Sequence, residues 1–185
     1  IFSACTSIVF YNLGSLIDHK DELDANPNRT DEQGSTPLSL ASLNGDLDVV
    51  TYMLSTFKNI DINSPNTDGS VPIIKAAQKG HFELIQYLAS FPQIDINYQN
   101  LGGMCALHVA ALRGHFNIVK FLCSLPNIEL NLESKTGVNA VSFAAYNGHF
   151  DIVKYYQISN YIILWGFMML YITLLLVNIT IFLSI

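Results

Sequence analysis

The side chains most able to do chemistry in this sequence are five histidines and three cysteines, residue types that serve as metal ligands, general acids and bases, or nucleophiles. Three of the histidines, His81, His115 and His149, are spaced 34 residues apart, and each follows a glycine. This regular spacing favours one histidine in the same turn of each structural repeat over a converging metal site. His19 lies in an acidic stretch and is interpreted as a solvated side chain.

The cysteines, Cys5, Cys105 and Cys123, are odd in number and contain no C-x-x-C pair. They therefore indicate neither a disulfide framework nor a zinc site, and a reducing compartment fits them best. The sequence also lacks the H-E-x-x-H and G-x-S-x-G motifs and a glycine-rich phosphate loop. We therefore predict that the protein is not an enzyme and that it has no cofactor, no metal site and no small-molecule substrate.

The charge balance narrows the classes of partner. Nine Lys and Arg residues stand against 15 Asp and Glu residues, which gives a formal net charge of −6, and there is no basic run. Such a surface repels the phosphate backbone of DNA and RNA. We therefore predict no nucleic-acid partner.

The elements that must position these residues follow an internal repeat. Three independent series of residues, two of glycine and one of asparagine, recur at intervals of 34 or 35 residues. The series are Gly34, Gly69, Gly103 and Gly137; Gly45, Gly80, Gly114 and Gly148; and Asn28, Asn63, Asn97 and Asn131. A period of this length is typical of solenoid proteins, in which each unit buries its apolar face against the next unit.

Each unit is predicted to contain two short helices. In the first unit, Thr36 caps a helix that begins at Pro37, and Gly45 ends it. Val71, Cys105 and Asn139 stand at the positions equivalent to Thr36, and of these three only Asn139 is expected to cap with its side chain. Pairs of alanines in the middle of the later first helices predict close helix packing. The second helices carry wide apolar faces that only a neighbouring unit can cover.

The sequence resembles the ankyrin-repeat family. The segments that carry the resemblance are Thr36-Pro37-Leu38, Leu107-His108-Val109-Ala110-Ala111, the Gly-His pairs and Asp61-Ile62-Asn63. The resemblance implies an all-α solenoid of helix–turn–helix units with projecting fingers, used to bind other proteins. It also implies a structural role for His108, whose ring bonds neighbouring backbone in this family.

The predicted organisation has six parts. Residues 1–30 form a degenerate half-repeat or cap, with Leu16, Ile17 and Leu23 as core candidates. Three complete repeats follow at 31–65, 66–99 and 100–133, and a truncated repeat at 134–157. A single hydrophobic helix is predicted at 161–185.

The resemblance implies that a protein partner binds the concave face, which is formed by the finger tips and the outward side of each first helix. Tyr146 and Arg113 are expected to contribute most to this binding, because aromatic residues and arginine dominate interface energetics. The predicted partner-binding residues are Gln78, Lys79, Leu101, Met104, Leu112, Arg113, Val138, Tyr146 and Asn147.

The last 25 residues, 161–185, carry no charge, and 20 of them are apolar. As a helix they would span about 37 Å, against a bilayer core of about 30 Å. They therefore predict a membrane anchor for cytoplasmic repeats. Three other interpretations stay open: a buried helix of the solenoid, a tail produced by a shift of reading frame, and a fragment of a channel or transporter that carries ankyrin repeats.

Overall fold

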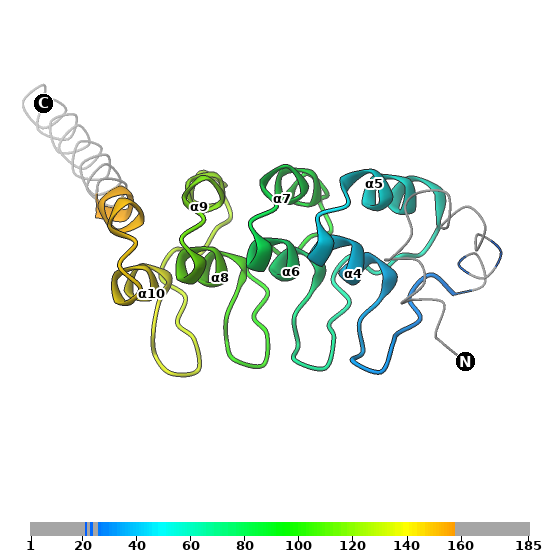
Figure 1. Ribbon diagram of the computed structural model, residues 1–185, viewed down its shortest axis with the longest axis horizontal. Coiled ribbons are helices and arrows are strands. Elements are labelled where there is room, and N and C mark those ends of the chain that lie inside the picture. The colour runs from blue at the N-terminus through cyan, green and yellow to red at the C-terminus, as the bar shows by residue number, and fades with distance from the viewer. Residues whose placement is uncertain (1–20, 22, 24–25, 158–185) are drawn as a thin grey trace, which may run out of the picture.

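The computed structural model describes residues 21, 23 and 26–157, which form a stack of helix–turn–helix repeats. The named helices are α4 (Pro37–Asn44), α5 (Leu47–Thr56), α6 (Pro72–Lys79), α7 (Phe82–Ala89), α8 (Ala106–Arg113), α9 (Phe116–Cys123) and α10 (Ala140–Tyr146), and residues 150–157 are also helical. Figure 1 shows α4, α6, α8 and α10 side by side in one row, with α5, α7 and α9 in a second row. The all-helical repeat fold predicted from the sequence is confirmed.

The first helices begin as the sequence predicts. The hydroxyl of Thr36 accepts a hydrogen bond from the amide of Ser39 at 3.2 Å, and the Asn139 side chain accepts one from the amide of Ser142 at 3.1 Å. Val71 makes no side-chain cap. The α4 and α10 caps therefore use the side chain of the N-cap residue, whereas at α8 the amide of Cys105 donates to Nδ1 of His108 at 3.3 Å.

Successive repeats are held together where each first helix ends. Gly114 ends α8 with a φ of 77°, and the ring of His149 from the next repeat lies directly against it. The same ring makes a 3.1 Å hydrogen bond through Nε2 to the carbonyl of Leu112. His81 bonds the carbonyl of Leu43 in the same way at 3.0 Å. The Gly-His series seen in the sequence is thus a contact between neighbouring repeats.

The asparagine series also bridges neighbouring repeats. Asn63 donates from Nδ2 to the carbonyl of Gln93 at 2.7 Å and accepts the amide of Asp95 at 3.2 Å. Asn28 and Asn97 make the equivalent pair of bonds, each to the loop of the following repeat. Since each pair satisfies one carbonyl and one amide, these side chains fix the register between loops.

The core runs continuously along the stack between the two rows of helices. The predicted close packing is confirmed in α6 and α8, whose alanine pairs are fully buried, whereas in α10 Ala144 is buried and Ala145 is exposed. Leu23 is fully buried as well, which confirms its predicted place in the core. Leu16, Ile17 and the hydrophobic segment 161–185 lie outside the described residues. No helix in the described part of the chain is long and apolar enough to cross a lipid bilayer.

Candidate protein-binding face

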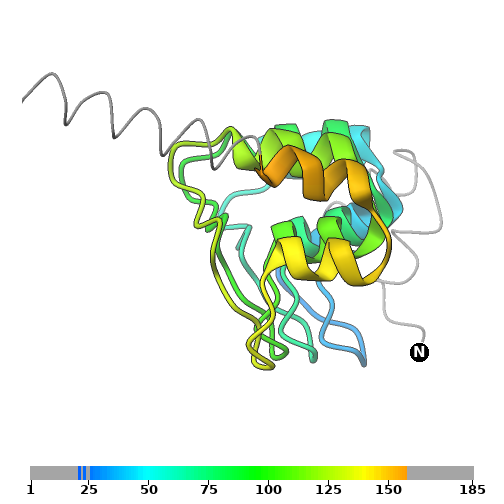
Figure 2. The ribbon, with the colours of Figure 1, turned by 90° about the vertical axis from the view of Figure 1, so that its left-hand side faces the viewer.

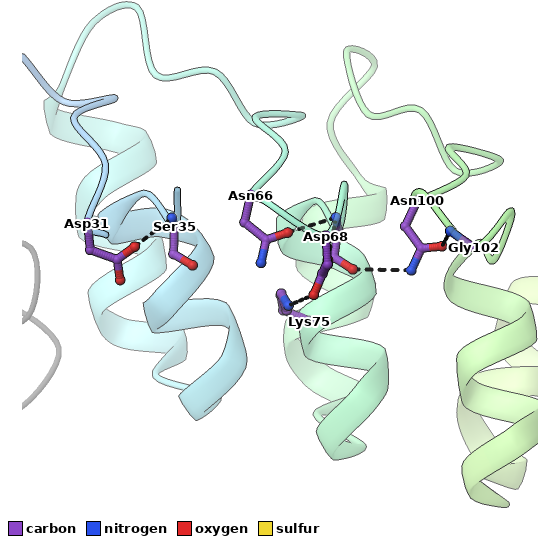
Figure 3. Close-up of polar contacts among 8 residues, drawn as sticks. Asp31, Ser35, Asn66, Asp68, Lys75, Asn100 and Gly102 are labelled. Atoms are coloured by element: carbon purple, nitrogen blue, oxygen red, sulfur yellow. Dashed lines mark hydrogen bonds and ion pairs between the residues drawn. The ribbon is translucent and has the colours of Figure 1, made fainter. Parts of the chain in front are cut away.

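The fingers are built by one recurring turn. In the first finger, Asp31 accepts hydrogen bonds through Oδ1 from the amides of Gln33 at 2.9 Å and Ser35 at 2.8 Å. Asn66 and Asn100 hold the second and third fingers by accepting the amide four residues on, at 2.9 and 3.0 Å. Such turns form because a short polar side chain can replace a backbone acceptor. Figure 3 shows Asp31, Asn66 and Asn100 at equivalent places in neighbouring fingers.

Neighbouring fingers are joined by one backbone hydrogen bond each. The amide of Thr67 donates to the carbonyl of Gln33, that of Leu101 to Asp68, and that of Lys135 to Gly102, all at 3.0 Å. The fingers therefore form a continuous ribbon that projects from the row of first helices, as Figure 2 shows end-on. This ribbon and the first helices together form the face on which the sequence predicts partner binding, here called the concave face.

The predicted partner-binding residues fall into two groups on this face. Gln78 and Lys79 lie at the end of α6, Leu112 and Arg113 at the end of α8, and Tyr146 and Asn147 at the end of α10. Leu101, Met104 and Val138 belong to the fingers. A first helix of eight residues, about 12 Å long, separates the two groups.

Two large apolar side chains of the predicted set are strongly exposed. Tyr146 is 90% exposed and Leu101 is 63% exposed. Lys79, Arg113 and Asn147 are exposed as well, whereas Gln78, Met104, Leu112 and Val138 are partly buried. The latter half of the face therefore offers apolar and aromatic surface flanked by cations.

The sequence analysis missed an ion pair on the same face. Lys75, in the middle of α6, lies 2.9 Å from Asp68 Oδ2 in the second finger, as Figure 3 shows. The Lys75 side chain is only 12% exposed and that of Asp68 is 57% exposed. Partial burial would raise the pKa of Asp68, but hydrogen bonds from Ser70 and Lys75 outweigh it and lower the pKa to about 2. Lys75 lies one helical turn before Lys79, which the sequence predicts to contact the partner. Because residues four apart lie on the same side of a helix, this spacing could have identified Lys75.

The two described cysteines and His108 are held in unreactive settings. Burial raises the pKa of the Cys105 thiol, and it raises that of Cys123 to about 11, so both thiols stay protonated at neutral pH. Burial also lowers the pKa of His108, which bonds the carbonyl of Leu132 through Nε2 at 2.9 Å. Among the residues that the structure describes, no cluster of three or more His, Cys, Asp or Glu side chains could hold a metal ion.

Comparison with known families agrees with this geometry. Residues 5–100, 54–134 and 74–157 each match the family model described as ankyrin repeats in three copies, and together these matches cover most of the chain. The chain belongs to the ankyrin-repeat family.

Among curated proteins, alpha-latrocrustotoxin-Lt1a of Latrodectus tredecimguttatus is 30% identical over 83 residues, which is 45% of this chain. The matched segment is 6% of the toxin's own length.

Proposed function

We propose that this chain is a non-enzymatic adaptor that binds a partner protein on the concave face of its ankyrin repeats. The observation that carries the proposal is the exposure of Tyr146 and Leu101 on that face. Tyr146 and Arg113 are both exposed, and tyrosine and arginine are enriched at the centre of protein interfaces. The toxin match covers too little of that protein to add an activity to this proposal.

The test is quantitative capture of partner proteins by the tagged full chain in cells of its source organism. The double substitution Arg113→Ala with Tyr146→Ala removes the two side chains expected to contribute most. We expect at least a tenfold loss of the captured partner, because hot-spot truncations cost about 2 kcal/mol or more each.

The matched control changes two exposed residues of the outer helices, Gln86 in α7 and Lys120 in α9, to Ala. This control should capture the partner as the unchanged chain does. Equal capture by all three proteins would contradict a role for the concave face.

We also propose that residues 161–185 are a membrane anchor, which keeps cytoplasmic repeats at a membrane surface. The support is their sequence, 25 residues without charge. Alkaline carbonate extraction of the full chain tests this, with the double substitution Leu170→Arg and Leu174→Arg as comparison. Each central arginine opposes insertion by about 2.5–3.5 kcal/mol, so the variant should move to the soluble fraction while the unchanged chain stays with membranes.

A further inference from the structure

The concave face has a second, chemically different region at its other end. A cleft of about 370 Å³ lies between the first two repeats. Fingers one and two contribute Asp31, Asn66 and Asp68 to its wall, and α4 contributes Leu40 and Leu43. The cleft is large enough for one or two side chains of a partner and lies at the lower end of the range of small-molecule pockets.

The carboxylates of this cleft can accept further hydrogen bonds. Asp31 uses Oδ1 for the finger turn, and within the described part of the chain no hydrogen bond is made by its Oδ2. Asp68 is more than half exposed, and its low pKa keeps it ionised at neutral pH. Lys75 neutralises one of the two carboxylates. The cleft therefore carries a net negative charge.

Two other features of the wall suit a long cationic side chain. Ser39 is 2% exposed, and its hydroxyl has no hydrogen-bond partner among the described residues. A buried polar group in this state gains from a ligand that supplies a partner. Leu40 and Leu43 are half-buried and offer apolar surface to an aliphatic stem. Arginine and lysine combine such a stem with a charged head.

We propose that the cleft between the first two repeats receives an arginine or lysine side chain of the protein partner, while apolar residues of the same segment contact the third and fourth repeats. This inference rests on the proposed function and adds the orientation of the partner. Asp31 and Asp68 form the cation-binding end of the site, and Tyr146 in α10 forms the apolar end, whereas Leu101 adjoins Asp68 through the hydrogen bond between their fingers.

The other repeats explain why the cation binds at one end only. At the positions equivalent to Asp68, the third and fourth fingers carry Gly102 and Thr136. At the positions equivalent to Lys75, α8 and α10 carry Val109 and Phe143. Neighbouring helices pack about 8–10 Å apart, so the two ends of the site lie about 20 Å apart, which an extended peptide covers in about six residues.

The experiment is a selection of 16-residue peptides from a random displayed library on the immobilised full chain. Selected peptides are then titrated against the full chain and its variants by fluorescence anisotropy. We expect selected peptides to share a basic residue and a large apolar residue separated by about six positions. Replacing the basic residue by Gln should weaken binding about tenfold.

Each substitution in the protein introduces a residue that another repeat carries at the equivalent position, or serves as a control in the same finger. Asp31→Asn removes the charge but keeps the turn, since Asn66 and Asn100 make the same turn. Glu32→Gln is the control, because Glu32 is exposed in the same finger and lies outside the wall of the cleft. Asp31→Asn should weaken binding about tenfold, and Glu32→Gln less than twofold.

A second variant removes both members of the Asp68–Lys75 ion pair, so that neither charged side chain is left without its partner. Asp68→Gln with Lys75→Leu copies Gln33 and Leu40, the residues at these positions in the first repeat. Because the variant removes Asp68 but leaves Asp31 in place, we expect it to reduce the preference of the selected peptides for Arg or Lys over Gln without abolishing it. Circular dichroism checks that each variant folds.

The outcomes separate this inference from the proposed function. Peptides that lose affinity with Tyr146→Ala but not with Asp31→Asn would overturn the proposed cation-binding end and leave the concave binding site intact. Equal effects of Asp31→Asn and Glu32→Gln would also overturn it. A selection that yields no peptide sensitive to any concave substitution counts against both proposals.

Discussion

The third and fourth repeats carry the same alanine pair and the same Gly-His-Phe turn, yet the structure gives these residues different surroundings. Ala111 of α8 is fully buried by the next repeat, whereas its equivalent Ala145 in α10 is exposed. Phe116 makes an edge-to-face contact with Tyr155, with ring centres 5.9 Å apart, whereas its equivalent Phe150 is 74% exposed. In a solenoid, then, the role of a residue is set as much by the next repeat as by its own.

The first prediction turns this comparison into a matched pair of substitutions. Ala111→Leu forces extra atoms into a closed contact between α8 and α10, so we expect a loss of about 3 kcal/mol in the free energy of unfolding. Ala145→Leu makes the same change at the exposed position and should cost less than about 0.5 kcal/mol, since Leu is a good helix former. Chemical unfolding of the full chain, followed by circular dichroism, measures both.

The control for this pair is Ala111→Ser, which copies Ser42 from the first repeat. Ser42 occupies the equivalent position in α4, is fully buried, and donates to the carbonyl of Leu38 at 2.7 Å. Ala111→Ser keeps the residue small and should therefore cost far less than Ala111→Leu. Equal losses from the two leucine substitutions would break the comparison, because they would mean that Ala145 is also covered.

The second prediction uses Gly114, which ends α8, and its equivalent Gly148, which follows the C-cap residue of α10. Gly114 and Gly148 have φ values of 77° and 76°, so a Cβ at either position costs about 1–2 kcal/mol in backbone strain. At Gly114 the new Cβ would also collide with the ring of His149, whereas at Gly148 no atom of the described residues lies within 4 Å of it. Gly114→Ala should therefore cost about 1 kcal/mol more than Gly148→Ala in the same unfolding measurement.

A result in which Gly148→Ala is the more destabilising of the two would contradict the assignment of His149 as the neighbour that matters. The double substitution Gly114→Ala with His149→Ala sharpens the test. It removes the collision but also the bond from His149 to Leu112, so its cost should be smaller than the sum of the two single substitutions.

Much of the scaffold could be predicted from the sequence because its signals are local and periodic. Thr36 and Asn139 cap helices through bonds within three residues, and Gly45 ends α4 by its own backbone conformation. The alanine pairs of α6 and α8 are buried as the close packing predicted from the sequence requires, whereas in α10 Ala144 is buried and Ala145 is exposed. Each of these properties depends on a few consecutive residues repeated at one interval.

Properties that depend on a neighbouring element were harder to predict. The sequence placed His81 and His149 in turns, but their contacts reach carbonyls 38 and 37 residues earlier, in the preceding repeat. Lys75 was not singled out, because its partner Asp68 lies in a finger that folds back along α6. The exposure of Tyr146 likewise depends on the neighbours of α10, which no pattern within the repeat encodes.

The smallest expected effect concerns the Asp68–Lys75 pair, which belongs to one repeat and so should contribute less than contacts between repeats. The pKa of Asp68 falls from 3.8 to about 2 in the folded chain, so its stabilising effect is present above about pH 4 and is lost as pH falls toward 2. Since Asp68 is largely exposed, we expect less than about 1 kcal/mol at neutral pH.

Asp68→Asn preserves the shape of the side chain and its ability to accept from the amide of Ser70. The difference in unfolding free energy between the unchanged chain and this variant should therefore shrink from pH 5 to pH 2. A difference that stays constant over this range would show that the charge of Asp68 does not stabilise the fold. A loss at neutral pH as large as that of Ala111→Leu would mean that contacts between repeats do not outweigh those within one.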